Sequence, residues 1–500
     1  MKKLVLLPLL TLLILSSCNG DNTSSSKSTS TSEPTSTSTS VPTSEPTSTP
    51  TSESTSKLTS EPTSQPSSIT TLNPSTSTTS YEPFTTTIDY DGLPGHYLFE
   101  YKGGSNIKGT FEAEFVFKDE FLSLPSNEPS KEFALVSYGL ACSANYYDKA
   151  KAVLEYLEFD DLYLTPYYKE ETDINKCAYT FAHKKLGDND IVAVLPRSGD
   201  YYLEWVNNFA LGRSGDHQGF KARAEEIYAD LKDYLKDKGY ENIKFYLAGY
   251  SRGGAFANIV SHYIMSRQEL EYVDLYCYTF ECPKGLALDN APKYENVFNF
   301  YNSGELIPYL APTQFGLTRC GTDIDMYSPR LDEYMAYFYG EAELTPFSPN
   351  EKFANETEYC EYVISLLDQI TFDGENYLTR EILCDKYSEV TAYLLPLLGQ
   401  LDIHELEKLA SNIMAIPNVV LKVFLLGNFM EIRNAVKAIL DENNIEYDEE
   451  TLFSEINNLC VTVKTLASPV VTEFMMRRNN IMRAALAHDY KAVFALLSAF

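Results

Sequence analysis

The sequence predicts an α/β fold in which a mostly parallel sheet is flanked by helices. Between residues 190 and 301, short apolar runs recur and are separated by segments with helical spacing. Strands that alternate with helices pair in parallel, and helices then cover both faces of the sheet. A glycine-rich pentapeptide around Ser251 stands where one apolar run passes into a helix, and this is the third observation that favours the fold.

The expected elements follow in order along the chain. Alternating apolar and polar side chains in residues 92–120 predict a β-hairpin or edge strands. Apolar side chains at helical spacing between residues 220 and 235 predict an amphipathic helix that is closed by Gly239. Buried strands are expected at 191–195, 245–248, 275–280 and 297–301.

The first 80 residues differ in composition from the rest. Residues 1–17 combine two lysines, an apolar stretch and small residues before Cys18, which is typical of a lipoprotein signal peptide. Cys18 falls where the bacterial lipobox places its acylated cysteine, so we expect lipid attachment there. Residues 18–80 are nearly all Ser, Thr and Pro and are expected to be a disordered linker. The protein is therefore expected to be exported and lipid-anchored to the outer face of a bacterial cell membrane.

The remaining chain is long enough for a core and an appendage. Residues 81–320 are expected to form the α/β core with an N-terminal β extension. Beyond Cys320 the strand signal disappears, and residues 321–480 are expected to be a large helical insertion or cap. The core is expected to return in residues 481–500.

Charge and cysteine content exclude several classes. The formal net charge of −30 would repel nucleic acid and an anionic bilayer as electrostatic partners. The sequence has no paired Cys-x-x-Cys and no histidine cluster, so we expect no metal and no cofactor. Eight cysteines remain besides Cys18, and their pairing is left open.

Gly249, Tyr250, Ser251, Arg252 and Gly253 form a G-x-S-x-G pattern. A strand precedes it and a helix follows it, which is the setting that holds a nucleophilic serine in an exposed, strained turn. The helix N-terminus also offers backbone N–H groups to developing negative charge. The pattern in this setting predicts an α/β-hydrolase fold with Ser251 as the nucleophile.

Four further segments are informative, namely VLPRSG at 194–199 followed by Trp205, HQGF at 217–220, TFECPKG at 279–285 and NSGELIPYLAP at 302–312. They resemble motifs of the class 3 (fungal-type) triacylglycerol lipase family. The segment at 279–285 is similar to a family strand that reads Thr-Phe-Gly-x-Pro-Arg-Val-Gly. The resemblance covers roughly residues 140–320 and the last 20 residues.

A serine hydroxyl needs a base, and the base needs an acid that orients it. His488 fits the order nucleophile, acid, histidine, and it matches the family's C-terminal histidine that precedes a tyrosine. Glu305 stands where the resemblance places an aspartate, with Asp323 and Asp325 as alternatives. The other histidines lie in less suitable segments, namely His96, His183, His217, His262 and His404.

The resemblance also implies an oxyanion hole. It would combine the backbone N–H of Arg252 with one from the loop at 197–199. The family has Gly and then Thr or Ser in this loop, whereas this chain has Ser198 and then Gly199. Gly199 can therefore offer only its backbone, and Ser198 is a second contributor.

The leading hypothesis is a lipase- or carboxylesterase-like serine hydrolase that acts on small-molecule or lipid esters. Ser251 would attack the acyl group, with His488 as the base and Glu305 as the acid. The alternative is a non-catalytic, surface-displayed binding or adhesion protein on a degenerate hydrolase scaffold. A peptidase is a third hypothesis, because the same serine arrangement serves several reactions.

Overall fold

The computed structural model describes most of the chain after Leu93. The described residues are 93–102, 110–168, 176–199, 208, 210–340, 345–372, 374, 377–417, 422–423 and 426–500. The expected signal peptide, the linker and Cys18 lie outside the described residues, as does Trp205.

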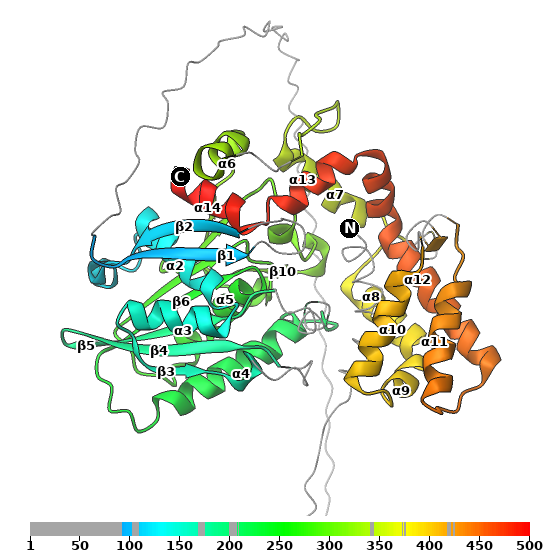
Figure 1. The fold of residues 1–500 in the computed structure, drawn as a ribbon, viewed down its shortest axis with the longest axis horizontal. Coiled ribbons are helices and arrows are strands. Elements are labelled where there is room, and N and C mark those ends of the chain that lie inside the picture. The colour runs from blue at the N-terminus through cyan, green and yellow to red at the C-terminus, as the bar shows by residue number, and fades with distance from the viewer. Residues whose placement is uncertain are drawn as a thin grey trace, which may run out of the picture. The chain divides into compact units, whose positions relative to one another are not determined.

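Seven strands form one sheet (Figure 1). They are β3 (Asp160–Leu164), β4 (Tyr179–Leu186), β5 (Asn189–Pro196), β6 (Ile243–Tyr250), β7 (Asp274–Phe280), β9 (Val297–Tyr301) and β11 (Thr322–Asp325). Their order is β11-β9-β7-β6-β5-β4-β3. Every pair from β11 to β5 is parallel, whereas β4 is antiparallel to both of its neighbours. The mostly parallel sheet of the expected α/β-hydrolase fold is confirmed.

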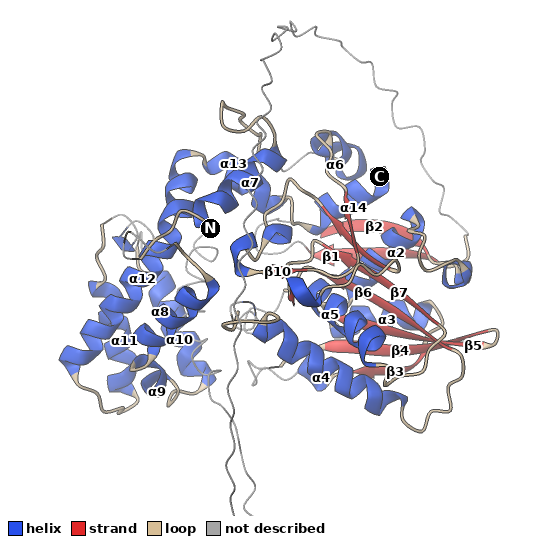
Figure 2. Ribbon diagram, turned by 180° about the vertical axis from the view of Figure 1, so that it is seen from behind, coloured by secondary structure: helices blue, strands red, loops and turns tan. Residues whose placement is uncertain are grey.

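Helices cover both faces of this sheet (Figure 2). In β6, Phe245 and Leu247 belong to one apolar cluster, while Tyr246 and Ala248 belong to the other. Alternate residues of a strand point to opposite faces, so a strand that is buried on both faces has a continuous apolar sequence. The first cluster includes residues of α4 (Gln218–Leu235) and α5 (Arg252–Arg267), and the second includes residues of α2 (Lys131–Ser143), α3 (Tyr147–Tyr156), α6 (Leu331–Tyr339) and α14 (Tyr490–Ala499).

A β-hairpin packs against the second of these clusters. Strands β1 (His96–Lys102) and β2 (Thr110–Val116) pair antiparallel, as the alternating sequence predicts. Phe99 and Phe115 are buried in the cluster. The shorter elements are β8 (Leu286–Ala287), β10 (Leu317–Thr318), η2 (Asp119–Ser123), η3 (Pro166–Tyr168), η5 (Leu288–Asn290), η6 (Ile307–Tyr309) and η7 (Thr313–Phe315).

A helical segment interrupts the chain between β11 and the C-terminal helix. Its helices are α7 (Glu356–Leu367), α8 (Arg380–Thr391), α9 (Leu394–Leu398), α10 (Ile403–Ala415), α11 (Met430–Glu442), α12 (Glu449–Met476) and α13 (Arg478–Leu486). Side-chain caps accept a backbone N–H at the start of α7, α8, α10 and α12, which explains where these helices begin. Residues of α9 to α12 form an apolar core of their own.

The sheet extends beyond Cys320, the residue after which the sequence predicts no further strand. Strand β11 lies inside the segment that was expected to be helical, and it is the edge strand beside β9. Its sequence, TDID, lacks an apolar run because three of its four side chains are exposed. An edge strand of this kind gives little periodic signal.

Helix α12 is, among the residues that the structure describes, the one helix long and apolar enough to cross a membrane. Core helices of soluble proteins pass the same test, and a third of the apolar window is buried within the protein. Leu452, Ile456 and Leu459 of α12 belong to the core of the helical segment. The face of α12 that carries these three residues therefore packs in that core.

The cysteine pairing that the sequence leaves open is clear for the described part of the chain. Its eight cysteines form no disulfide with one another, and seven of them are buried. Burial raises the pKa of the Cys277 thiol to about 12. A thiol in this environment stays protonated and behaves as a small apolar side chain.

Arg380, at the start of α8, ties the helical segment to the loop at 211–216. Its guanidinium donates hydrogen bonds to the carbonyl oxygens of Gly212 at 2.5 Å, Gly215 at 2.6 Å and Asp216 at 2.9 Å. Only 5% of Arg380 is exposed. A buried charged donor with several carbonyl partners fixes the position of the loop relative to α8.

Candidate active site

Ser251 stands at the sharp turn between β6 and α5. Its backbone adopts φ 53° and ψ −127°, a strained conformation for a non-glycine residue. A Cβ on Gly249 would lie 2.3 Å from the carbonyl oxygen of Gly253, and a Cβ on Gly253 would lie 2.6 Å from the carbonyl oxygen of Pro196. Both positions require glycine because the backbone approaches too closely for a side chain.

His488 reaches Ser251 from the turn between α13 and α14. Its Nε2 lies 2.9 Å from Ser251 Oγ. The imidazole stacks on the ring of Tyr250, with 4.9 Å between centroids, and the Tyr250 hydroxyl donates to the backbone carbonyl of His488. The residue before the serine therefore holds both the ring and the backbone of the histidine.

Glu305 lies on the other side of the imidazole. Its Oε1 is 3.0 Å from His488 Nδ1 and also accepts the backbone N–H of Ile307 at 2.7 Å. The residue follows β9, next but one to the strand that carries the serine, and its side chain is fully buried. The structure thus brings together Ser251, His488 and Glu305, the three residues expected from the sequence.

The two alternative acids have other partners. Asp323 forms an ion pair with Arg319 at 2.6 Å and accepts a hydrogen bond from the side chain of Asn299. Asp325 accepts the backbone N–H of Ser303 at 3.1 Å. These carboxylates stabilise the loop around Glu305, and the imidazole contact belongs to Glu305.

The remaining histidines lie in different environments. His217 caps α4 by accepting the N–H of Phe220, and burial lowers its pKa to about 3. His183 lies between the carboxylates of Asp160 and Asp190, at 2.5 and 2.8 Å. The other three are His96 on β1, His262 on α5 and His404 on α10.

The loop expected to supply the oxyanion hole packs against the start of α5. The Arg252 guanidinium donates to the carbonyl oxygen of Ser198. Ser198 donates its backbone N–H at 2.9 Å and its hydroxyl at 2.6 Å to Asn145 Oδ1. Asn145 Oδ1 therefore accepts from both donors of Ser198, which argues against Ser198 as a donor to an oxyanion.

Sequence reasoning missed Asn145 as part of this site. Its amide nitrogen donates to the hydroxyl of Tyr490, two residues after His488, while its oxygen binds Ser198. One buried side chain thus links the expected oxyanion loop to the histidine turn. Asn145 follows α2, far from both in sequence, and nothing in the local sequence indicates this contact.

Sequence reasoning also missed a second carboxyl beside Glu305. Glu281 follows β7 and is fully buried. Its Oε2 accepts the backbone N–H of Asn302 at 3.0 Å, and its carboxyl lies close enough to that of Glu305 for Glu305 to raise the pKa of Glu281. The available signal was a glutamate at a position where the resembled family motif has glycine.

Burial raises the pKa of both carboxyls. For Glu305 it raises the pKa to about 8, against the opposing effect of hydrogen bonds from Glu281 and from the N–H of Ile307. For Glu281 burial also raises the pKa well above its ordinary value, and the charge of Glu305 adds to this effect. The imidazolium that forms on proton transfer would favour the ionised form of Glu305, 3.0 Å away.

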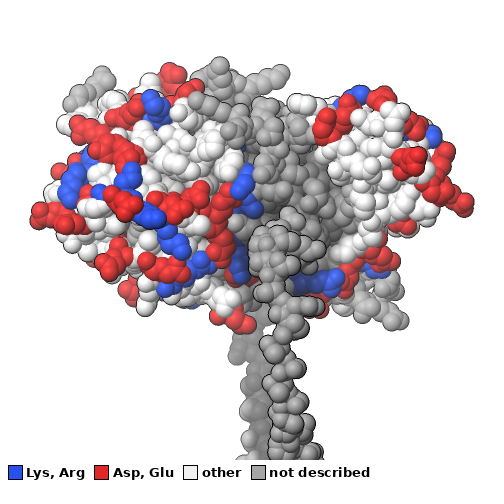
Figure 3. Space-filling view, turned by 90° about the horizontal axis from the view of Figure 1, so that it is seen from below, with Lys and Arg blue, Asp and Glu red and all other residues white. Residues whose placement is uncertain are grey.

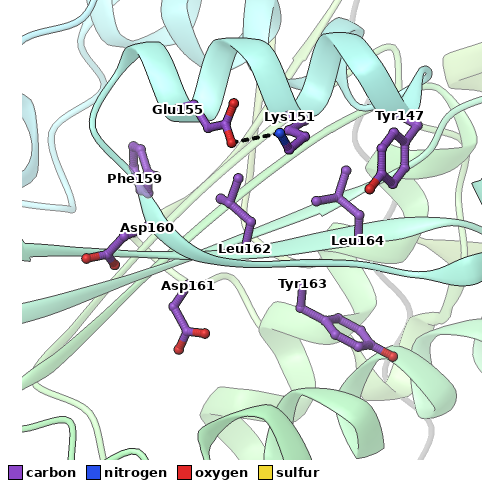
Figure 4. Close-up of a pocket in the computed structure, with 9 residues that line it drawn as sticks. All are labelled: Tyr147, Lys151, Glu155, Phe159, Asp160, Asp161, Leu162, Tyr163 and Leu164. Carbon is purple, nitrogen blue, oxygen red and sulfur yellow. Dashed lines mark ion pairs between the residues drawn. The ribbon is translucent and has the colours of Figure 1, made fainter.

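An open hollow of about 550 Å³ lies elsewhere, beside the edge strand β3 (Figure 4). It is lined by residues of α3 and β3, and it holds the ion pair of Lys151 with Glu155 at 2.9 Å. Its lining lacks Ser251, His488 and Glu305. We therefore assign it no part in the chemistry.

Charge on the surface is mixed, with a large acidic share. Figure 3 shows Asp and Glu side chains spread over one face, with Lys and Arg interspersed among them. Together with the formal charge of −30, this distribution would repel a polyanion approaching that face.

Comparison with protein families gives one match. The family model described as Lipase (class 3) matches residues 200–315, which is under a quarter of the 500-residue chain. The matched range contains Ser251 and Glu305, whereas Gly199 and His488 lie outside it. A comparison with curated proteins finds no match.

Several solved structures resemble part of the chain. The triacylglyceride lipase of Rhizomucor miehei is 17% identical, with 40% of this chain and 82% of that chain covered and a TM-score of 0.30. A lipase from Rhizopus microsporus var. chinensis is 15% identical, with coverage of 38% and 72% and a TM-score of 0.29. The Lip2 lipase from Yarrowia lipolytica is 15% identical, with coverage of 39% and 78% and a TM-score of 0.28.

Proposed function

We propose that this chain is a serine hydrolase that cleaves carboxylic esters through an acyl-enzyme at Ser251. The position of the His488 imidazole is the observation that supports this proposal. Its Nε2 lies 2.9 Å from Ser251 Oγ, and its Nδ1 lies 3.0 Å from Glu305 Oε1. A hydroxyl becomes a competent nucleophile when a base takes its proton and an acid orients that base. Both distances lie within the reach of about 2.6–3.2 Å over which such groups exchange protons.

The reaction proceeds in two halves. Ser251 Oγ attacks the ester carbonyl carbon while its proton passes to His488 Nε2. The bond between the carbonyl carbon and the alcohol oxygen then breaks, and His488 gives the proton to the leaving alcohol. Water attacks the resulting acyl-enzyme and gives a proton to His488. Collapse releases the carboxylic acid and returns that proton to Ser251. Glu305 stabilises the imidazolium in each half.

Negative charge on the carbonyl oxygen is met by backbone donors. The N–H of Arg252, at the first position of α5, and that of Gly199 are the proposed pair. The hydrogen bond from the Arg252 side chain to Ser198 supports this assignment, because it holds the loop against the serine turn. One donor of this kind typically contributes about 10²–10³ in turnover.

Lipid esters are the proposed substrate class. The match to the Lipase (class 3) family model supports a lipase-type hydrolase. We place the enzyme on the outer face of a bacterial membrane, anchored through acylated Cys18. Metabolic labelling with a palmitate analogue tests the anchor, since labelling should disappear in Cys18→Ala; persistent labelling would exclude Cys18 as the attachment site.

The activity is tested with the purified protein, p-nitrophenyl esters of increasing acyl length and a fluorophosphonate probe. Ser251→Ala is expected to lose both labelling and turnover. Ser266→Ala, an exposed serine on the same helix α5, is the matched control and should behave as the wild type.

Two outcomes would contradict the proposal. Labelling that survives Ser251→Ala would assign the nucleophile to another residue. A folded wild-type protein that neither reacts with the probe nor hydrolyses any acyl ester would favour the alternative, a surface-displayed binding protein on a degenerate scaffold. Cleavage of amide but not ester substrates would favour a peptidase.

A further inference from the structure

Glu281 occupies a place that the sheet topology makes part of the site. Strand β7 lies between β6, which leads to Ser251, and β9, which leads to Glu305. Phe280 pairs with Tyr250 on one side and with Phe300 on the other, so the residue after it stands between the two functional loops. The side chain of Glu281 is buried there beside Glu305.

The backbone at this position is one that glycine favours. Glu281 has φ +47°, in the left-handed region. The similar family strand has glycine here, so this chain holds a glutamate in a conformation that a glycine would adopt without strain. A strained, buried, ionisable residue next to a candidate active site suggests that its carboxyl has a function.

In the part of the chain that the structure describes, the contacts of the two carboxyls leave one buried oxygen on each without a donor. Glu281 Oε2 accepts the N–H of Asn302, and Glu305 Oε1 accepts the N–H of Ile307. Within the described residues, the remaining oxygens, Glu281 Oε1 and Glu305 Oε2, are buried and meet no other donor. Two carboxylates cannot hydrogen-bond to each other, whereas a carboxylic acid can donate to a carboxylate.

The charged surroundings favour the proton on Glu281. Glu305 faces the positive charge of Arg319 and the imidazole of His488, which stabilise its ionised form. Glu281 faces the negative charge of Glu305, which opposes its own ionisation and outweighs the opposite effect of His488 on the pKa of Glu281. The other titratable groups that interact with this pair are Tyr250, on β6, Tyr301, on β9, and Cys360, on α7.

We propose that Glu281 is a positioning residue which, as a carboxylic acid, donates a hydrogen bond to Glu305 Oε2 and so keeps Oε1 directed at His488. The inference rests on the proposed esterase function and deepens it. Glu305 then has a donor on each oxygen. The buried acid and carboxylate together carry one negative charge, which is the charge needed to balance the imidazolium.

The kinetic test compares two variants of nearly equal size. Glu281→Gln keeps a neutral donor and should retain kcat and KM within about threefold of the wild type. Glu281→Met removes the donor and should lower kcat roughly 10- to 100-fold with little change in KM, because a buried charged acceptor loses a partner. A Gln variant as impaired as the Met variant, or a Met variant with wild-type kcat, would overturn the proposal.

Infrared spectroscopy tests the acid without reference to activity. The difference spectrum of wild type minus Glu281→Gln at neutral pH should contain the C=O stretching band of a carboxylic acid. Glu473→Gln is the control, since Glu473 is equally buried but paired with Arg477 at 2.6 Å, and should give no such band. Absence of the band for Glu281 would overturn the proposal, whether or not the protein proves to hydrolyse esters.

Discussion

Shortening or neutralising Glu305 tests the geometry of the proposed site most directly. In Glu305→Asp the carboxylate retreats by about the 1.5 Å of one carbon–carbon bond. The contact with His488, now 3.0 Å, would open to about 4.5 Å, outside hydrogen-bond range. The contact with the N–H of Ile307 would be lost in the same way.

The expected loss follows from these distances. We expect kcat for p-nitrophenyl butyrate to fall roughly 10²–10³-fold in Glu305→Asp. The shortened carboxylate would still attract the imidazolium of His488 from a distance, but it would no longer accept a hydrogen bond from it. Glu305→Gln should lose about 10⁴-fold, since an amide stabilises the wrong tautomer of the base. Circular dichroism and thermal unfolding verify that both variants fold.

Asp323→Asn and Asp325→Asn are the matched controls, because these residues were the alternative acids and lie on the adjacent strand β11. Both are expected to keep kcat within about threefold, as neither carboxylate is needed for proton transfer. An Asp variant of Glu305 with wild-type kcat, or a control that abolishes turnover, would refute the assignment of Glu305.

The remaining predictions concern the histidine and the helical segment. Tyr250→Phe should lower kcat a few-fold, since stacking on His488 persists while the hydroxyl contact is lost; stopped-flow turnover that matches the wild type would contradict this. In a pH–rate profile, kcat/KM should fall as the pH drops below the ordinary histidine value of about 6.5, because His488 must be neutral to act as the base. A profile that is flat down to pH 5 would exclude this base. Arg380→Met should lower the free energy of unfolding, measured in urea, by about 2–4 kcal/mol. Arg213→Met breaks an exposed ion pair and should change this free energy by less than about 0.5 kcal/mol. Equal effects of the two substitutions would refute the role of the buried Arg380 contacts.

The fold and the nucleophile could be predicted from sequence because their signals are local. The strand, the G-x-S-x-G turn and the following helix span residues 243–267 without interruption. Gly249 and Gly253 are required because a side chain there would collide with the backbone of the turn or with the backbone at the end of β5. The order of functional residues is compatible with His404 and His488, and the resemblance to the family's C-terminal histidine favours His488.

Several features could not be predicted, each for a physical reason. Strand β11 is a short, exposed edge strand, and its sequence lacks the apolar pattern of the buried strands. The bonds of Asn145 to Ser198 and Tyr490 join residues that lie 53 and 345 positions away. Such contacts leave no periodic trace in the sequence, because they arise only when distant elements pack.

By itself, the sequence predicted the parallel sheet and the serine turn with Ser251, because local spacing carries that information, and the family resemblance with the chain order added His488 and Glu305 as predicted site residues. The tertiary structure decided which oxygen faces which nitrogen, and it placed Glu281 against Glu305. That neighbourhood depends on the strand order β9-β7-β6, in which the residues after three strands meet at one edge of the sheet. A buried carboxyl acquires its protonation and its partner only from such neighbours.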